Sequence, residues 1–504
     1  MRTAALLLTS LAASPLVLVA ASDIIARSVP GDRVLALNFD KHRYRAGGHS
    51  SSRLAKRTVE SSLKNEYLLY YIDVEIGTPP QQMRLQIDTG SSDVWVPSAS
   101  SKFCSSSEEP CIEGAYDPAL STSRSIVSRK GFNISYLDDT HATGDYVTET
   151  FSFGNCTISD LQMGIGYETD IPAGIMGIGY PSNTAAEVAY PGLVESLVSH
   201  GYINSHAYSL YLNDQESEKG AVLFGGIDTK KYAGDLRGLP IIVENEEGIP
   251  TDFLVDLSSV GFIGKNGTER TISTEKLHVV LDSGSSLTYL PNSTVAPIVK
   301  NFGGYWDGDT GVYIVPCSLS NNHEEFVTYQ FGDRQGPKIK VPMEELTNYA
   351  VDSRGHLVPD DDGNPVCYFG IQPQTEDLGT TYIFGDTFLR SAYVVYDLDG
   401  QEIWMAQTIF NATESNILEI RNSTLTRSGV PKVKGVEGEP NFAPTNTEQK
   451  SSPTSSATQG STSAATTGAQ ATETNHPSMG LQLQTSGLFG LAIGIVGCIV
   501  GAMI

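Results

Sequence analysis

The sequence predicts an all-β protein made of two similar lobes, with few short helices. Short runs of β-branched and aromatic residues recur between turn residues from residue 67 to residue 408, a pattern typical of strands. Two nearly identical motifs, IDTGSSDVWV at 87–96 and LDSGSSLTYL at 281–290, lie far apart in the chain. At 504 residues the chain is also longer than one hydrophobic core usually supports.

The expected strands follow one another through the middle of the chain. They are the segments 67–77, 83–90, 93–98, 131–138, 146–154, 207–212, 220–226, 252–262, 278–284 and 393–398. Two stretches have the pattern of helices, GLVESLVSHG at 192–201 and STVAPIVKNFG at 293–303. We therefore expect helices to be a minor part of the fold.

Each Asp motif is followed by an apolar segment that contains glycine. AGIMGIG, with Ile175, follows the first motif, and TYIFGD, with Ile383, follows the second at a similar distance. Two lobes that each contribute one Asp turn and one such strand would be related by an approximate twofold axis. We expect the N-terminal lobe at 58–235 and the C-terminal lobe at 236–412.

The first 57 residues have the form of segments that are removed during export. An apolar run that ends on small residues at Ala21 predicts a signal peptide at 1–21. Residues 22–57 contain eight basic and three acidic residues and end in a Lys-Arg pair. This indicates a propeptide released after Arg57 by a dibasic-cutting protease. A basic leader on an acidic body suggests an electrostatic latch, with a folding spacer as the alternative.

The C-terminal part predicts a stalk and a lipid anchor. Residues 413–478 include a tract at 445–474 rich in Ser and Thr, a composition typical of an O-glycosylated stalk. Residues 479–504 end in an apolar segment with no Lys or Arg after it, which favours a removed GPI-anchor signal over a retained membrane span. The expected attachment residue is Ser478, with Asn475 and Gly480 as alternatives.

The composition indicates the secretory pathway and argues against nucleic-acid binding. The chain has 33 basic and 58 acidic residues and a net charge of −25. Such a charge disfavours binding to the phosphate backbone of nucleic acids, which requires Lys and Arg. It favours the binding of positively charged peptides. The potential N-glycosylation acceptors are Asn133, Asn155, Asn266, Asn292, Asn411 and Asn422. We expect a glycoprotein anchored on the outer face of the plasma membrane, or transferred to the cell wall.

Both Asp motifs supply the donors that a buried carboxylate needs. An ionised carboxylate in a dry site costs several kcal/mol unless hydrogen-bond donors surround it. In each motif a glycine permits a tight turn, and hydroxyl groups can bond the carboxylate or connect the two turns. The residues expected to support the pair are Thr89, Gly90, Ser91, Ser283, Gly284 and Ser285.

The two aspartates predict a specific chemistry. If the twofold axis brings the turns together, Asp88 and Asp282 would lie within about 3 Å, where one proton is shared. The charged member can then act as general base on a water molecule, while the protonated member donates to a substrate carbonyl. The motif pair therefore predicts hydrolysis of amide bonds at acidic pH without a covalent intermediate.

These motifs and their apolar-glycine partners resemble those of pepsin-family aspartic endopeptidases, in particular the fungal GPI-anchored yapsin type. The resemblance covers about residues 67–408 and implies a bilobal pepsin-like fold with catalytic Asp88 and Asp282. It also implies a hairpin flap over the substrate, whose tyrosine would be Tyr136 in GFNISYLDDTHATGDY, with Trp95 as its hydrogen-bond partner.

The resemblance also implies how the cysteines are used. The family's two disulfides correspond to Cys104–Cys111 and Cys317–Cys367, and they leave Cys156 as a buried free thiol. The loop between the first pair is short, so we expect a single chain rather than the two-chain form of some yapsins.

The flap departs from the usual family pattern. After Tyr136 the sequence reads Leu137-Asp138-Asp139, where pepsin-like members usually continue with glycine. Acidic residues at this place would bind substrate and favour Lys or Arg before the scissile bond, as in yapsin-type enzymes. The alternative for Asp138 and Asp139 is a solvated turn.

Two other classes of function are alternatives. Paired carboxylates also hydrolyse glycosides, and a stalk with an anchor suits a non-enzymatic wall adhesin. The sequence has no zinc-protease, serine-hydrolase, Cys-x-x-Cys or phosphate-loop motif, so no metal or organic cofactor is expected. We expect a monomer that processes or sheds cell-surface and secreted proteins.

Overall fold

The β-rich architecture predicted from the sequence is present in the structure. A computed structural model describes residues 33–41, 69–106, 111–217, 219–352, 356–374, 381–420, 434–438, 440 and 442. The α-helices in these ranges are α1 (Leu193–Ser199), α2 (Asn292–Asn301) and α3 (Asp386–Leu389). The first two coincide with the predicted helical stretches. Short 3-10 helices are η1 (Pro181–Asn183), η2 (Cys317–Asn321) and η3 (Met343–Leu346).

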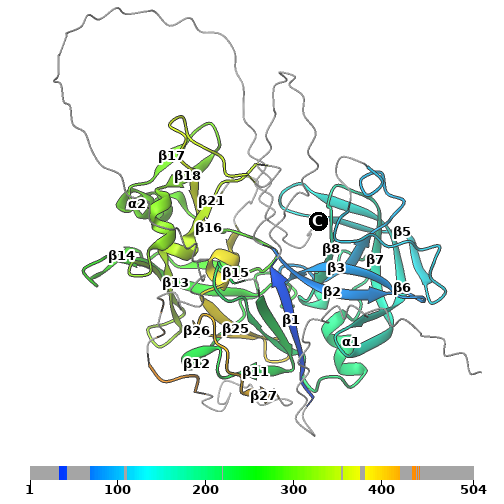
Figure 1. The fold of residues 1–504 in the computed structure, drawn as a ribbon. Coiled ribbons are helices and arrows are strands. Elements are labelled where there is room, and N and C mark those ends of the chain that lie inside the picture. Colours follow the sequence, from blue (N-terminus) through cyan, green and yellow to red (C-terminus); the bar gives the residue numbers. More distant parts are fainter. Residues whose placement is uncertain are drawn as a thin grey trace, which may run out of the picture.

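The largest sheet has thirteen strands and runs through both halves of the molecule (Figure 1). In order across the sheet, its strands are β12 (Tyr232–Pro240), β26 (Glu402–Thr408), β25 (Ala392–Asp397), β9 (Ala207–Tyr211), β10 (Lys219–Phe224), β1 (Leu35–Lys41), β2 (Tyr70–Ile76), β3 (Gln81–Asp88), β8 (Gly174–Gly177), β4 (Val94–Pro97), β7 (Cys156–Thr169), β6 (His141–Phe153) and β5 (Ser125–Ser135). In β2, Asp73 and Glu75 are exposed while Val74 and Ile76 are buried, which is the alternation of a strand with one wet face.

The described residues also form three smaller sheets, two of them made only of strands from the C-terminal half. The eight-stranded sheet contains β20 (Lys338–Pro342), β19 (Phe326–Phe331), β13 (Leu254–Ile263), β15 (Leu277–Leu281), β24 (Tyr382–Phe384), β16 (Thr288–Leu290) and β23 (Ile371–Pro373), with β14 (Glu269–Ser273) paired to β13. The four-stranded sheet contains β17 (Tyr305–Asp307), β18 (Val312–Val315), β22 (Cys367–Phe369) and β21 (Thr347–Tyr349). The third sheet pairs β11 (Gly226–Asp228) with β27 (Ile417–Glu419).

The strands around the two Asp motifs repeat one arrangement. Strand β3, which ends at Asp88, is parallel to β8; β8 is antiparallel to β4, and β4 is parallel to β7. Strand β15, which precedes Asp282, is parallel to β24; β24 is antiparallel to β16, and β16 is parallel to β23. The apolar-glycine segments of the sequence are β8 and β24. The strand pairing therefore shows the approximate twofold relation expected from the sequence.

The two lobes share strands instead of being joined by a linker. β12 pairs with β26, and β25 pairs with β9, so segments from both halves of the chain meet in the thirteen-stranded sheet. The boundary expected between residues 235 and 236 falls inside β12. Because β12 pairs with β26 on both sides of this boundary, with an irregularity between Ala233 and Arg237, the lobes form one continuous body.

Strand β1 comes from the segment expected to be a propeptide. It pairs with β10 from Leu35 to Asp40 and with β2 at two positions. Leu35 and Leu37 are buried in the core. In Figure 1, β1 crosses the centre of the molecule between the two lobes. The leader segment thus supplies an internal strand of the largest sheet.

The folded body continues beyond residue 412. β27 pairs with β11, and Ser415 Oγ and Asn416 N–H donate to the carboxylate of Asp228 at 2.7 and 2.8 Å. The expected start of the stalk at residue 413 is therefore wrong, because residues 413–420 make strand and side-chain contacts with the lobe. The composition could not locate the boundary between lobe and stalk, because the Ser/Thr-rich tract begins only at residue 445, well after the lobe ends.

Several expected features lie outside the described residues. They are the signal peptide, the cleavage after Arg57, the acceptor Asn422, the tract at 445–474, and the anchor signal with Ser478, Asn475 and Gly480. In the part of the chain that the structure describes, no helix is both long and apolar enough to cross a membrane.

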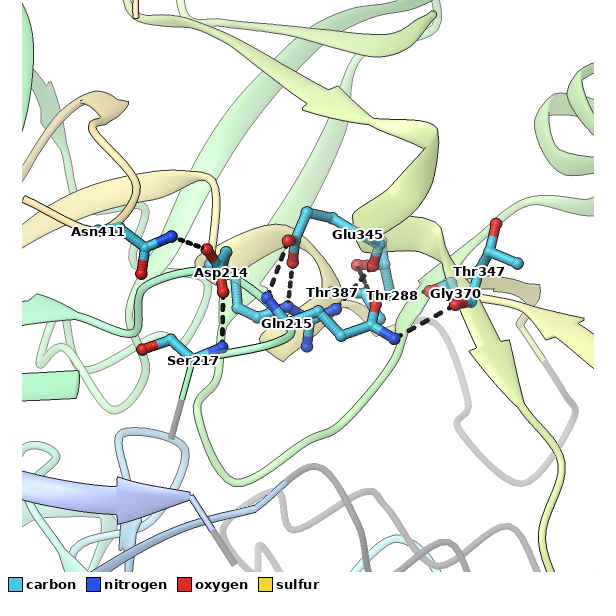
Figure 2. Close-up of polar contacts among 10 residues, drawn as sticks. Asp214, Gln215, Ser217, Thr288, Glu345, Thr347, Gly370, Thr387 and Asn411 are labelled. Carbon is cyan, nitrogen blue, oxygen red and sulfur yellow. Dashed lines mark hydrogen bonds and ion pairs between the residues drawn. The ribbon is translucent and has the colours of Figure 1, made fainter. Parts of the chain in front are cut away.

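A buried polar junction fixes the region behind the C-terminal Asp turn. Arg390 follows α3, and its Nε donates to the carboxylate of Glu345, while its Nη2 donates to the Glu345 carbonyl oxygen at 2.6 Å. The other carboxylate oxygen accepts the N–H of Gln215 at 2.8 Å. Figure 2 shows Gln215 in contact with Glu345 and with the carbonyl oxygen of Thr347. Because Arg390 and Glu345 are both buried, removing either would leave an uncompensated charge.

Candidate active site

Asp88 is the last residue of β3 and is fully buried. Its Oδ1 accepts the N–H of Gly90 at 2.8 Å, and its Oδ2 accepts the hydroxyl of Ser91. Its main-chain carbonyl oxygen accepts the N–H of Ile178, just beyond β8, at 2.9 Å. The carboxylate is therefore held by its own turn, and the turn is held by the neighbouring strand.

Asp282 has matching contacts in the other lobe and is also fully buried. Its Oδ1 accepts the N–H of Gly284 at 2.8 Å, and its Oδ2 accepts the hydroxyl of Ser285 at 2.5 Å. Its own N–H donates to the carbonyl oxygen of Phe384, in β24, at 3.1 Å. The two turns thus use the same residue types for the same contacts.

Thr89 and Ser283 connect the turns reciprocally. Thr89 Oγ1 donates to the Leu281 carbonyl oxygen and accepts the Ser283 N–H, both at 2.9 Å. Ser283 Oγ donates to the Ile87 carbonyl oxygen at 3.0 Å and accepts the Thr89 N–H at 3.2 Å. Four hydrogen bonds from these two residues fix the separation of the two aspartates.

The two carboxyl groups face a common point. A Cβ atom added at Gly284 would lie 2.4 Å from Asp88 Oδ1 and 3.0 Å from Asp282 Oδ1. Each of the two carboxyl groups influences the pKa of the other. Glycine is therefore required at this position, because any side chain would displace the carboxyl groups.

Burial and mutual repulsion change the acidity of this pair. Burial raises the pKa of Asp88. Burial, together with the negative charge of Asp88, raises the pKa of Asp282 well above the usual range of a carboxyl group. The pair therefore keeps one shared proton at pH values where isolated carboxyl groups are ionised.

The flap hairpin is formed by β5 and β6, and the turn that joins these strands carries Tyr136. The hydroxyl of buried Tyr136 accepts a hydrogen bond from Trp95 Nε1 at 2.6 Å. The rings of Trp95 and Phe132 are in contact, with centroids 5.8 Å apart. The base of the flap is thus attached to β4, the strand that follows the first Asp turn.

Asp138 and Asp139 lie at the tip of this hairpin. Asp139 is exposed and has a φ of 64°. Asp138 is half-buried, and Thr140 donates to its Oδ1 through both the N–H, at 3.1 Å, and the hydroxyl, at 2.6 Å. Burial raises the pKa of Asp138. Since both contacts end on Oδ1, Oδ2 can accept a hydrogen bond from a substrate.

Asp93 is a buried residue that sequence reasoning did not single out. Its Oδ1 accepts the hydroxyls of Tyr146 and Tyr190 at 2.8 and 2.6 Å, and its Oδ2 accepts the N–H of Ala185 at 2.7 Å. Asp93 thus links the segment that leads to Trp95 with a flap strand and a distant loop. Asp93 belongs to the first Asp motif, and this position could have drawn attention to it. Its hydrogen-bond partners could not be predicted, because all three come from distant segments of the chain.

Both disulfides implied by the resemblance are present, Cys104–Cys111 and Cys317–Cys367. Cys156 is free and buried, and burial raises the pKa of its thiol to about 12. A thiol with this pKa stays protonated and unreactive near neutral pH. Among the described residues, no group of three or more His, Cys, Asp or Glu side chains could hold a metal ion.

Five of the six glycosylation acceptors fall in the described ranges, and all five are exposed: Asn133, Asn155, Asn266, Asn292 and Asn411. Asn411 Nδ2 donates to the carboxylate of Asp214 (Figure 2). A glycan on Asn411 would therefore compete with this contact, whereas Asn133, Asn155 and Asn266 are accessible without such a cost.

The geometry of the two turns defines a class of enzyme. Two buried carboxyl groups that share a proton, each held by donors of its own turn, can activate a water molecule and polarise an amide carbonyl group. Their origin in two lobes with matching strand pairing is the arrangement of an aspartic endopeptidase.

Comparison with known proteins identifies the family. Residues 69–408 match the family model described as eukaryotic aspartyl protease. Relatives include "Probable aspartic-type endopeptidase opsB" of Aspergillus oryzae, 44% identical over 73% of this chain and 74% of the relative. "Aspartic proteinase yapsin-3" of Saccharomyces cerevisiae is 31% identical over 82% of this chain and 80% of the relative. The chain therefore belongs to the eukaryotic aspartyl protease family and is an aspartic-type endopeptidase.

A solved structure shows the same fold. The crystal structure of aspartic proteinase from Irpex lacteus matches 70% of this chain and 97% of that chain, with a TM-score of 0.53 at 21% sequence identity. The similarity to yapsin-3 supports the yapsin-type resemblance noted from the sequence. The alternatives of a glycosidase and of a non-enzymatic adhesin are not supported.

Proposed function

We propose that Asp88 and Asp282 are the catalytic pair of a cell-surface endopeptidase that acts at acidic pH and cuts beside basic residues. The observation that carries this proposal is the pair of matched turns, which hold two buried carboxyl groups close to the same residue, Gly284. Membership of the aspartyl protease family supports it.

The proposed mechanism follows from the single proton that the two groups share. The ionised member of the pair takes a proton from a water molecule while the protonated member donates its proton to the carbonyl oxygen of the scissile bond. The water oxygen forms a bond with the carbonyl carbon. A proton then passes to the amide nitrogen, the C–N bond breaks, and the pair regains its single shared proton.

The acidic flap supports a preference for Lys or Arg before the scissile bond. Asp139 is exposed at the tip, and Asp138 keeps Oδ2 available. Asp170 adds a third carboxylate, since its charge raises the pKa of Asp138 and it binds the neighbouring His141 at 3.0 Å. A cationic side chain would therefore meet an acidic surface at the flap.

A digest of a peptide library tests this preference. The mature enzyme at about pH 4, between the two apparent pKa values of such a pair, is expected to cut after Lys or Arg. The double variant Asp138→Asn, Asp139→Asn is expected to lose this preference while still cutting peptides. Cuts between large apolar residues by the wild-type enzyme would contradict the role of the flap acids.

The proposed cellular route is export, processing after Arg57 and GPI anchoring at the outer face of the plasma membrane. The leader at 1–57, the Ser/Thr-rich tract and the C-terminal apolar segment support it. The two disulfides suit an oxidising compartment. Treatment of intact cells with a phosphatidylinositol-specific phospholipase is expected to release the enzyme. Retention after treatment, with release only by detergent, would indicate a membrane span instead.

A further inference from the structure

Asn292 is a glycosylation acceptor whose side-chain amide is held by a neighbouring tyrosine. It is the first residue of α2 and is exposed. Its Oδ1 accepts the hydroxyl of Tyr313, in β18, at 2.6 Å. An N-linked glycan is attached through the other amide atom, Nδ2, which makes no hydrogen bond with any described residue. Tyr313 therefore orients the amide and leaves the attachment atom accessible.

Tyr313 and Asn292 are both firmly held in the fold. The ring of Tyr313 is buried, and its N–H donates to Oε1 of buried Gln372, in β23, at 2.9 Å. Asn292 belongs to the first turn of α2, where the Pro291 carbonyl oxygen accepts the N–H of Thr294 at 2.8 Å. The acceptor and its tyrosine thus form one fixed unit.

The same tyrosine contacts an exposed tryptophan. Trp306 lies directly opposite Tyr313 in the pairing of β17 with β18, and their ring centroids are 5.0 Å apart in an edge-to-face arrangement. Trp306 is 46% exposed, whereas Trp95 is buried and Trp404 is half-buried. Figure 1 shows α2 beside β17 and β18 at the upper left of the C-terminal lobe. Tyr313 therefore joins the glycosylation acceptor to the most exposed tryptophan of the chain.

Tyr305 is a second exposed aromatic residue of β17, and it differs from Trp306 in direction. It is 62% exposed and lies opposite Ile314 in the strand pairing. Because successive side chains of a strand point to opposite faces, Tyr305 and Trp306 lie on different faces of this hairpin. Of the two, only Trp306 shares a face with Tyr313.

The first sugars of an N-linked glycan match such a surface chemically. N-acetylglucosamine has apolar C–H faces and an acetyl methyl group, which pack on aromatic rings while the hydroxyl groups stay hydrated. Large exposed aromatic rings are unfavourable in water. A sugar that is already attached beside the ring has a high effective concentration there, so docking costs little entropy.

We propose that the first sugars of an N-linked glycan on Asn292 dock on Trp306 and cover the apolar surface at this end of the C-terminal lobe. This inference rests on the proposed export of the chain, because N-linked glycans are added in the secretory pathway. Asn266 offers a contrast, since its Oδ1 accepts the N–H of Thr268 at 3.0 Å within its own turn. No aromatic side chain orients that amide.

The test compares two replacements of one residue that differ in whether the acceptor triplet survives. Thr294→Val destroys the triplet but keeps Asn292 and its contact with Tyr313, whereas Thr294→Ser preserves the triplet. Both variants are produced from the full-length precursor in a eukaryotic host, and mass spectrometry of glycopeptides measures occupancy. Thr294→Val is expected to increase acrylamide quenching of tryptophan fluorescence and to lower Tm by roughly 2 °C or more. Thr294→Ser is expected to match the wild type in both measurements.

Two further variants assign the effect to Trp306. In the Trp306→Ala background, Thr294→Val is expected to cause no additional loss of Tm, because the docking surface is already absent. In the Tyr305→Ala background, the full loss is expected. Equal losses in the two backgrounds would overturn the inference. Unchanged quenching in Thr294→Val, or a wild-type enzyme without a glycan on Asn292, would overturn it as well.

Failure of this inference is distinguishable from failure of the proposed function. If Asn292 carries no glycan while other acceptors do and the enzyme cuts peptides, glycan docking fails and the proposed function stands. If the enzyme from its natural host carries no glycan at any acceptor, the proposed export route fails as well.

Discussion

Gly284 is the most tightly confined residue between the two aspartates. A methyl group there would lie 2.4 Å from Asp88 Oδ1 and 2.8 Å from Asp88 Cγ. We predict that Gly284→Ala displaces Asp88 and lowers kcat/KM roughly 100-fold or more, since misplacement of a reacting group by about 1 Å has this effect. Peptide cleavage at acidic pH measures the loss.

The matched control is Gly308→Ala, because an added methyl group there meets nothing within 4 Å. It is expected to keep wild-type activity. If Gly284→Ala were as active as Gly308→Ala, the close approach of the two carboxyl groups would be contradicted.

The sequence was informative about residues whose contacts are local. Ser91 and Ser285 bind the aspartate three positions before them, so the repeated motif was enough to predict their contacts. Asp93 was missed, because its partners come from segments tens of residues away. Such contacts form only when the sheets assemble, so the spacing of residues in the sequence does not predict them.

At the scale of elements, the β25–β26 hairpin brings two buried carboxyl groups together. Asp397 and Glu402 are directly opposite in the strand pairing. Asp397 Oδ1 accepts the N–H of Gly400 at 2.9 Å, while its Oδ2 has no partner among the described residues. Burial, with the charges of Asp399 and Glu402, raises the pKa of Asp397 to about 6.

This raised pKa makes the hairpin less stable at neutral pH. The folded state holds the proton of Asp397 more tightly than the unfolded chain, whose group ionises near pH 3.8. The stabilisation of the folded state by the proton on Asp397 is therefore complete below pH 3.8, and it is lost as the pH rises through about 6.

We predict that Asp397→Asn increases the free energy of unfolding at pH 7 by roughly 2 to 3 kcal/mol, because asparagine stays neutral. At pH 3.5 the variant should have no advantage. Urea unfolding at both pH values measures the difference, with exposed Asp361→Asn as the control. A gain for Asp397→Asn that is equal at both pH values would refute the explanation.

The sequence indicated α1, α2 and the strands next to the two Asp motifs, whereas several long strands, among them β7, β12 and β26, lie outside the expected segments. The helices α1 and α2 and the strands next to the motifs have clear periodicity or clear β-forming composition. Among the strands that were missed, β1 lies in the segment interpreted as a propeptide, and β27 has only three residues. Each becomes a strand through a partner far away in the chain, β10 and β11 respectively.

For the whole molecule, β1 connects the leader with both halves of the largest sheet. We predict that a precursor without residues 33–41 gives a much lower yield of folded enzyme, because β10 loses one of its two partner strands and the core loses Leu35 and Leu37. Deletion of the equally long segment 44–52 is the control and should have a smaller effect. The yield of secreted, active enzyme measures both.

Equal yields from the two deletions would show that β1 is dispensable for folding. Processing after Arg57 would cut the chain between β1 and β2 while leaving their hydrogen bonds in place. Release of the strand is therefore expected to be a step separate from the cleavage itself.

The molecule as a whole is suited to acidic surroundings. Burial raises the pKa of carboxyl groups in the catalytic pair, behind Trp95 and in the β25–β26 hairpin: Asp88, Asp282, Asp93 and Asp397. Each such group favours the folded state when it is protonated and disfavours it when it is ionised. Stability and the protonation state needed for catalysis therefore depend on pH in the same direction.

The central claim is that Asp88 and Asp282 act as one catalytic pair, and single replacements test it most directly. Asp88→Asn and Asp282→Asn preserve shape but remove the proton exchange, so each is expected to lower kcat/KM for one peptide at about pH 5 by roughly 1,000-fold. Circular dichroism should show that both variants remain folded. If either folded variant kept more than about a tenth of the wild-type activity, a paired mechanism would be contradicted.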